Sequence, residues 1–178
     1  MAGELDAVAR LARPEGLIVA SKDELIQGLE LLIREGRRVA ADLSPAQLET
    51  VVDVDGWKGK EMFAHVAGLG AMVAPMVTGI ANAAPGTDAI GGIDIDQLNA
   101  GIVAQRAALG ADALAEELEK NYRAVIEFVR NAPDDLLNRK ATARGYKDIP
   151  VSDLVNRMIV LHGLAHVYSV YSSVFWAV

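Results

Sequence analysis

Apolar residues recur at three- and four-residue steps along most of this chain, which is the period of a helix with one buried face. The clearest stripe runs through residues 22–42, and charged residues occupy its opposite face. Its apolar members are Leu25, Leu29, Leu32, Val39 and Leu43, with Gly36 as a small one. Ser21 and Glu24 form a capping-box pattern at its start. We therefore predict an amphipathic helix over residues 22–42.

Start and stop signals predict further helices along the chain. Ser44 and Pro45 begin one of a turn or two, because serine caps a helix and proline suits its first position. Three long segments and one short one follow, at about 57–81 (with Pro75 as a kink or an end), 94–109, 112–131 and 150–175. The short one is residues 94–109, which begin at Asp94 or Asp96.

Two segments are predicted to be loops. Residues 83–92 are rich in glycine and proline, and residues 138–148 are the most basic part of the chain, with no apolar period. No convincing alternating strand pattern occurs. The pattern predicts an all-α fold, an up-down-type four-helix bundle with an inserted short helix, in residues 21–178. Residues 1–20 are expected to form an N-terminal extension.

Composition and charge narrow the class of protein. The chain has 178 residues, 52% of them hydrophobic and 23% charged, which suits one globular domain. Its net charge of −7 argues against a nucleic-acid partner. It has no cysteine, so any metal site must use imidazole, carboxylate, carbonyl or water. The absence of cysteine and of a secretory signal pattern fits a cytoplasmic protein.

Two uncharged stretches, residues 62–87 and 158–178, approach the length of a membrane span. Glycine and proline interrupt the first, and the second contains histidine, tyrosine and serine, which are costly inside a bilayer. We therefore expect buried bundle helices and no membrane partner.

The three histidines are the candidate functional residues. His162 and His166 are four residues apart, so they share one face of the last helix, a spacing that helical metal sites use. The pair alone fits a packed core equally well. His65, the third and last histidine of the chain, lies in another uncharged helix. Together they predict one metal site with open coordination positions, the arrangement of a catalytic or ligand-binding centre.

These residues resemble a known family. The segment Trp57–His65 is similar to the tryptophan-led second helix of the DinB-like superfamily, and His162–His166 resembles its histidine pair on the final helix. The segment Asp96–Arg106 resembles the connecting helix of the mycothiol-dependent maleylpyruvate isomerase branch. In that branch the position of His162 is typically an acid, so this chain departs from it there.

The resemblance implies a metal-binding four-helix bundle with His65, His162 and His166 as ligands, usually of nickel or zinc. The superfamily contains thiol S-transferases and hydrolases, so it implies a small-molecule substrate and a low-molecular-weight thiol as cosubstrate. It also suggests that Asn99 and Arg106 line the substrate pocket; the alternative is a solvated polar face.

Glu61 lies one turn before His65, where it could orient that histidine or act as a general base. The alternative is an acid favoured by the helix N-terminus. Three functions stay open: a metal-dependent transferase or hydrolase, a module that sequesters a ligand without turnover, and a metal-free interaction protein that dimerises through its last helix.

Overall fold

The computed structural model describes residues 20–52 and 56–175. The predicted N-terminal extension therefore lies outside the described residues, except for Ala20.

Four long helical units form a bundle. The first is α2 (Lys22–Asp42), and the third is α7 (Ala111–Asn131). The second consists of α4 (Gly59–Leu69), the 3₁₀ turn η1 (Gly70–Met72) and α5 (Val73–Asn82). The fourth consists of α9 (Val151–Val155), the π-helical segment η2 (Asn156–Leu161) and α10 (His162–Phe175). Smaller elements are α3 (Pro45–Leu48), α6 (Ile95–Ala104), α8 (Asp134–Asn138), β1 (Lys140–Ala143) and β2 (Tyr146–Pro150).

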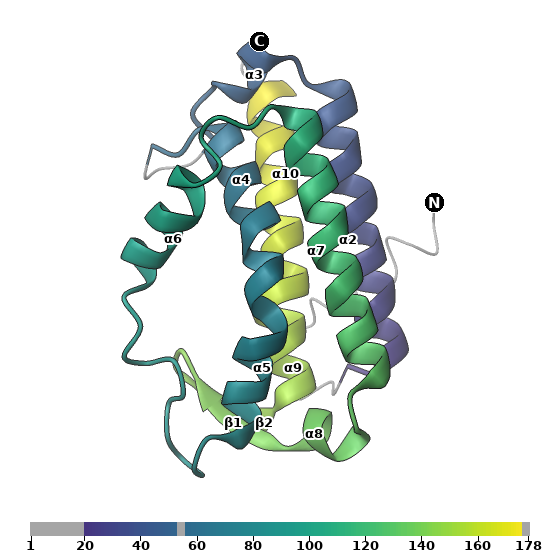
Figure 1. Cartoon of the computed structure of the whole chain (residues 1–178), viewed down its shortest axis with the longest axis vertical. Coiled ribbons are helices and arrows are strands. Elements are labelled where there is room, and N and C mark those ends of the chain that lie inside the picture. Colours follow the sequence, from purple (N-terminus) through teal and green to yellow (C-terminus); the bar gives the residue numbers. More distant parts are fainter. Residues whose placement is uncertain (1–19, 53–55, 176–178) are drawn as a thin grey trace.

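The bundle helices contact one another in the cyclic order α2, α7, α4 and α10. In Figure 1, α4–α5 and α7 run down the molecule, whereas α2 and α9–α10 run up it. The connection that carries α6 returns the chain from the lower end of α5 to the upper end of α7, and α6 packs on α4 outside the ring. The predicted all-α bundle with an inserted short helix is confirmed.

The core follows the predicted helical stripes. Leu25, Leu29, Leu32 and Val39 on α2 have no exposed side-chain surface. Ser21 caps α2 as predicted, because its hydroxyl accepts from the Glu24 N–H while the Glu24 carboxylate accepts from the Ser21 N–H. The same capping box forms between Ser44 and Gln47 at α3. The helix caps and the buried side chains therefore both favour the same helical structure along this part of the chain.

One prediction was wrong: residues 138–148 are not a loop, because β1 and β2 pair as an antiparallel hairpin. Arg144 and Gly145 form its two-residue turn, with φ angles of 49° and 84°. A tight hairpin turn requires such left-handed angles, which glycine adopts readily and arginine does not. The strands are too short to show an alternating pattern, and the fold places them beside α5 and α9.

The interruption of the second unit also differs from the prediction. The break is η1 at Gly70–Met72, whereas Pro75 lies in the first turn of α5. A proline there removes no hydrogen bond, because first-turn N–H groups have no partner within the helix. The helix α6 also ends at Ala104, before the predicted boundary at Leu109.

The segment Gly59–Asn82 is long and apolar enough to cross a membrane by composition, with a mean hydropathy of 1.6 in its most apolar window. In the fold, 56% of that window is buried inside the structure, as in a core helix of a bundle. Its apolar character is therefore accounted for by packing.

We predict that Leu32→Ala lowers the free energy of unfolding by about 2–5 kcal/mol, because it leaves a cavity in the core. Leu31→Ala is the matched control, since Leu31 lies on the same helix but is only half-buried. Urea denaturation followed by circular dichroism measures both. Equal losses for the two variants would contradict this description of the core.

Candidate metal centre

Three imidazole rings from two helices meet inside the bundle. His65 lies in α4, and His162 and His166 lie one turn apart at the start of α10. The Nε2 atom of His162 lies 3.2 Å from Nε2 of His65 and 3.1 Å from Nε2 of His166. One ring nitrogen from each residue lies within 4.8 Å of the other two. The structure therefore brings together the three residues that the spacing singled out.

These distances fit a shared metal ion. Metal–nitrogen bonds of about 2.0–2.1 Å in a tetrahedral site place the ligand nitrogens about 3.3 Å apart. Hydrogen bonding accounts for the cluster less well. The Nε2 atom of His162 faces two other ring nitrogens. A neutral ring nitrogen either donates one hydrogen bond or accepts one, so it cannot bond well to both. A cation accepts lone pairs from all three rings at once.

Burial keeps His65 and His162 uncharged. Desolvation, and to a lesser extent repulsion from His166, lowers the pKa of His65 from 6.5 to about 4. Desolvation also lowers the pKa of His162 to about 3, with smaller contributions from His166, His65 and Arg144. Neutral imidazole is the form that binds a metal, so both rings are ready to act as ligands at neutral pH.

The side of His65 away from the cluster involves its Nδ1 atom and the Trp57 ring. Its Nδ1 atom is buried and has no hydrogen-bond partner among the described residues. The Trp57 ring packs edge-on against it, with 5.6 Å between ring centroids. Trp57, at the entry to α4, thus fixes one side of the imidazole by packing.

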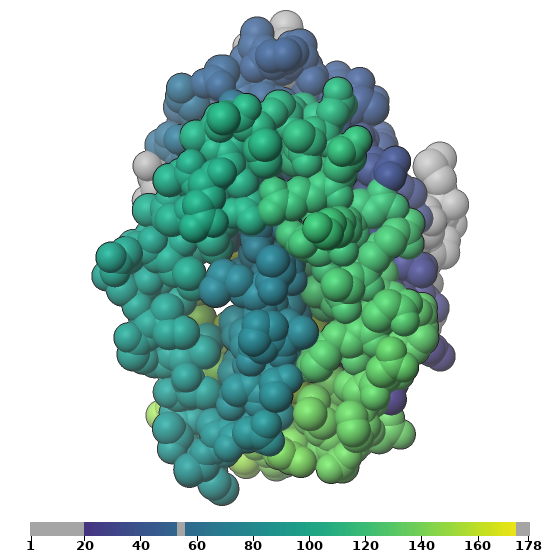
Figure 2. All heavy atoms as spheres, in the orientation of Figure 1, coloured from purple at the N-terminus to yellow at the C-terminus, as the bar shows by residue number. Residues whose placement is uncertain are grey.

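A cavity of about 380 Å³ opens next to the histidines. Its polar lining residues are His65, Asn99, Arg144, Tyr146, Arg157 and His162, and its apolar ones are Leu69, Met76, Ile90, Ile95, Leu98, Met158 and Ile159. No aspartate or glutamate is among these described lining residues. Figure 2 shows the surface open between the α6 segment and α4–α5, which line this cavity. The cavity joins solvent to the imidazoles.

The π-helical segment η2 helps to build this wall. It directly precedes His162 and contains Arg157. In a regular α-helix, residues five apart point about 140° away from each other. The wider turn of a π-helix brings such residues closer to one face, and Arg157 and His162 do line the same cavity. Such segments are frequent at functional sites.

The other residues predicted from the sequence to belong to the site lie at two different places in the structure. Asn99 lines the cavity with His65 and His162. Glu61 does not: its carboxylate accepts from the Lys58 N–H at 2.9 Å, as a helix N-terminal acid does. Glu61 and Arg106 both line a separate depression of about 150 Å³ between α4 and α6.

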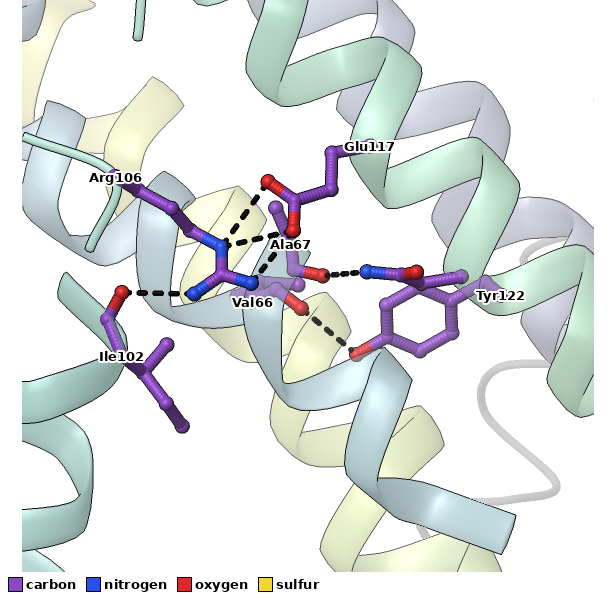
Figure 3. A network of polar contacts seen from close by, with 7 residues as sticks. Val66, Ala67, Ile102, Arg106, Glu117 and Tyr122 are labelled. Atoms are coloured by element: carbon purple, nitrogen blue, oxygen red, sulfur yellow. Dashed lines mark hydrogen bonds and ion pairs between the residues drawn. The ribbon is translucent and has the colours of Figure 1, made fainter. Parts of the chain in front are cut away.

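Arg106 serves as a link between α6, α4 and α7. Figure 3 shows its guanidinium donating to Glu117 and to the Ile102 carbonyl. The guanidinium also lies over Gly68, where an added Cβ would come within 2.5 Å of it. Beside it, the Tyr122 hydroxyl donates to the Val66 carbonyl, so α7 holds the α4 backbone just after His65. These contacts position the helix that carries His65.

Sequence reasoning missed three lining residues, Arg144, Tyr146 and Arg157. The Arg157 guanidinium donates to buried Asp153 at 3.0 Å and stacks on the Tyr146 ring. Arg144 and Tyr146 lie in the hairpin that was predicted to be a loop. The basic character of residues 138–148 was the available signal, but only the fold brings that segment to the histidines.

The fold and the site define a class: a four-helix bundle with a three-histidine cluster beside an open cavity. Residues 29–158 match the family described as the mycothiol maleylpyruvate isomerase N-terminal domain. Since this match covers most of the chain, the protein belongs to that family, and the predicted family is confirmed. No curated protein matches the chain.

Solved structures share the fold. The crystal structure of the mycothiol-dependent maleylpyruvate isomerase is 17% identical, with a TM-score of 0.63, over 85% of this chain and 61% of that one. A histidine-to-alanine mutant of that enzyme is 16% identical, with a TM-score of 0.59, over 82% of this chain and 60% of that one. The present chain thus spans about three fifths of their length.

We predict that metal-free protein loses stability as the pH falls below about 6.5. The unfolded chain takes up protons on its histidines near pH 6.5, whereas folded His65 and His162 stay neutral until about pH 4 and 3. The free energy of unfolding is therefore unaffected by these two histidines above pH 6.5 and falls as the pH drops below it. Midpoints of urea denaturation between pH 7.5 and 5 measure this loss of stability. An equal change of the midpoint with pH in a His65→Gln/His162→Gln variant would contradict the prediction.

We also predict that Glu117→Gln loosens α6. This variant leaves the largely buried Arg106 guanidinium without its charged partner, which costs about 1–3 kcal/mol. Amide hydrogen exchange in α6 should therefore become faster. Glu116→Gln is the control, because Glu116 is exposed on the same helix. Identical exchange in the two variants would exclude this linking role.

Proposed function

We propose that this protein binds one divalent metal ion, nickel or zinc, through His65, His162 and His166, and uses it in a thiol transfer reaction on a small molecule. The observation that carries the proposal is the convergence of three imidazole nitrogens beside a cavity that reaches solvent. Three protein ligands leave coordination positions open, as in catalytic sites. The cytoplasm is the compartment we expect.

The ligand set favours a thiol as the cosubstrate. Three neutral imidazole ligands would leave the positive charge of the ion uncompensated, and such an ion would favour the thiolate form of a nearby thiol. The family name supports the same class of cosubstrate, since it refers to an isomerase that depends on the thiol mycothiol. Asn99 supplies an amide that can orient the second substrate in the cavity.

Hydrolysis is less well supported. A hydrolase benefits from a general base beside the attacking water. The cavity lining contains no carboxylate among the described residues, and Glu61 is occupied at the start of α4. A thiolate is already the nucleophilic form and needs no such base.

Ligand capture without turnover is the second candidate function. The same lack of a carboxylate among the described lining residues favours it. The two functions separate on one measurement: a capture protein binds thiols and electrophiles stoichiometrically, whereas a transferase releases a thioether or isomerised product over many turnovers.

Removing any one ligand should abolish tight metal binding. We expect about one nickel or zinc ion per purified chain, and less than a tenth of that in His65→Ala, His162→Ala and His166→Ala, by elemental analysis. Chelator should lower the melting temperature of the wild type only, because the ion stabilises the folded state that binds it. Ser172→Ala is the control on α10. Full metal content in all three histidine variants would refute the site.

Thiol coordination is tested with cobalt-substituted protein. Dithiothreitol or cysteine should produce a thiolate-to-cobalt charge-transfer absorption in the near ultraviolet. The alcohol analogues glycerol and serine are the controls and should not produce it. An unchanged spectrum at millimolar thiol would argue against a thiol transferase and leave ligand capture of another kind.

A further inference from the structure

We propose that the cavity beside the histidines recognises the carboxylate of an amphipathic small molecule, with Arg144 as the residue that binds the carboxylate and the apolar wall as the site of its hydrocarbon part. The inference deepens the proposed function, on which it rests for the placement of this molecule beside a metal ion. It assigns a ligand class and a specificity residue that the three histidines do not define.

The charges of the lining point to a single anionic group. Two guanidinium groups, those of Arg144 and Arg157, line the cavity, and no carboxylate does among the described residues. Arg157 is already paired with Asp153, whose side chain is 3% exposed. The Arg144 guanidinium has no ion pair or hydrogen bond within the part of the chain that the structure describes. One positive charge is thus left for a ligand, and guanidinium binds carboxylate in a two-pronged geometry.

The backbone at Arg144 is strained in a way that places this side chain. Arg144 occupies the first position of the hairpin turn at φ 49°, where asparagine or glycine would be favoured. A bulky residue in this region is strained and persists where something else requires it. Here the arginine lies on the wall that it shares with His162.

Asp88, in the loop before α6, holds the hairpin turn in position. The Asp88 carboxylate accepts from the Arg144 N–H at 3.1 Å and from the Ile90 N–H at 3.2 Å. Both oxygens of Asp88 thereby serve the backbone, and they tie the turn to the loop before α6. Ile90 itself is buried and lines the cavity. The anchor fixes the point from which the Arg144 side chain extends.

The remainder of the wall fits a hydrocarbon group. Seven of the thirteen lining residues are aliphatic or methionine side chains from α4, α5, α6, η2 and the loop before α6. The cavity volume of about 380 Å³ lies at the small end of ligand sites. It accommodates a chain of about eight carbons more readily than a large conjugate. Charge at the rim and apolar surface along the wall together describe an amphipathic carboxylate.

Binding of octanoate to the full chain, measured by calorimetry, tests the inference. We expect octanoate to bind at least tenfold more tightly than octanamide, which lacks the charge, and than acetate, which lacks the chain. Octanoate should also bind more weakly at higher salt, because Arg144 is exposed and salt screens its charge. Equal affinity for octanoate and octanamide would overturn the inference. Tighter binding of octyl phosphate would overturn the carboxylate class in favour of a phosphate.

The Arg144→Asn variant separates recognition from structure. Asparagine suits the turn, so the melting temperature should rise or stay equal while octanoate affinity falls about tenfold. Asp148→Asn is the control, because Asp148 also has a positive φ, 53°, in the same hairpin but does not line the cavity. Unchanged affinity in Arg144→Asn would refute the role of Arg144, as would a loss of both affinity and stability.

The two proposals fail separately. The His166→Ala variant removes a proposed metal ligand that is not part of the cavity wall, so it should still bind octanoate in the presence of chelator. If it does while wild-type protein takes up no metal, only the proposed metal function fails. If Arg144→Asn retains full metal content but wild-type protein shows no preference for octanoate, only the present inference fails.

Discussion

The packing of α4 against α10 is the contact on which the chemistry of this protein depends, because it joins a histidine of one helix to two of another. Around it, the other elements hold these helices in place. Gly163 follows His162 and lets α10 approach Leu32 of α2, where an added Cβ would lie 2.7 Å from a leucine methyl. On the other side, α7 reaches the α4 backbone through Tyr122. The cluster is thus held from both neighbouring helices.

Charge is distributed unevenly in the molecule. The chain carries a net charge of −7, yet the described lining of the cavity contains two arginines, two histidines and no acid. An apolar wall around such groups strengthens their field. A cation bound by neutral imidazoles would make the cavity more positive still. The same features therefore serve both proposals: a thiolate near the ion and an anionic group near Arg144.

Local and periodic signals predicted most of this fold. The stripe from Leu25 to Val39, the serine caps and the histidine pair are all short-range patterns, and each appears in the structure as predicted. The hairpin was missed because Arg144 is a poor residue for its turn, so its pairing is imposed by the fold. The cavity wall was missed for a related reason: Arg144 and Arg157 meet Asn99 only through tertiary contacts and a π-helical turn. Arg106 was expected to line the substrate pocket, but in the structure its guanidinium pairs with Glu117 and lies outside the cavity beside the histidines.

The central claim is that one metal ion is held by three imidazoles, and X-ray absorption spectroscopy of zinc-loaded protein tests it most directly. The account predicts one zinc per chain, with about three imidazole nitrogens at about 2.0–2.1 Å and one further light-atom ligand. A shell made mainly of oxygen ligands, or spectra that stay unchanged when His65 is replaced by alanine, would contradict it.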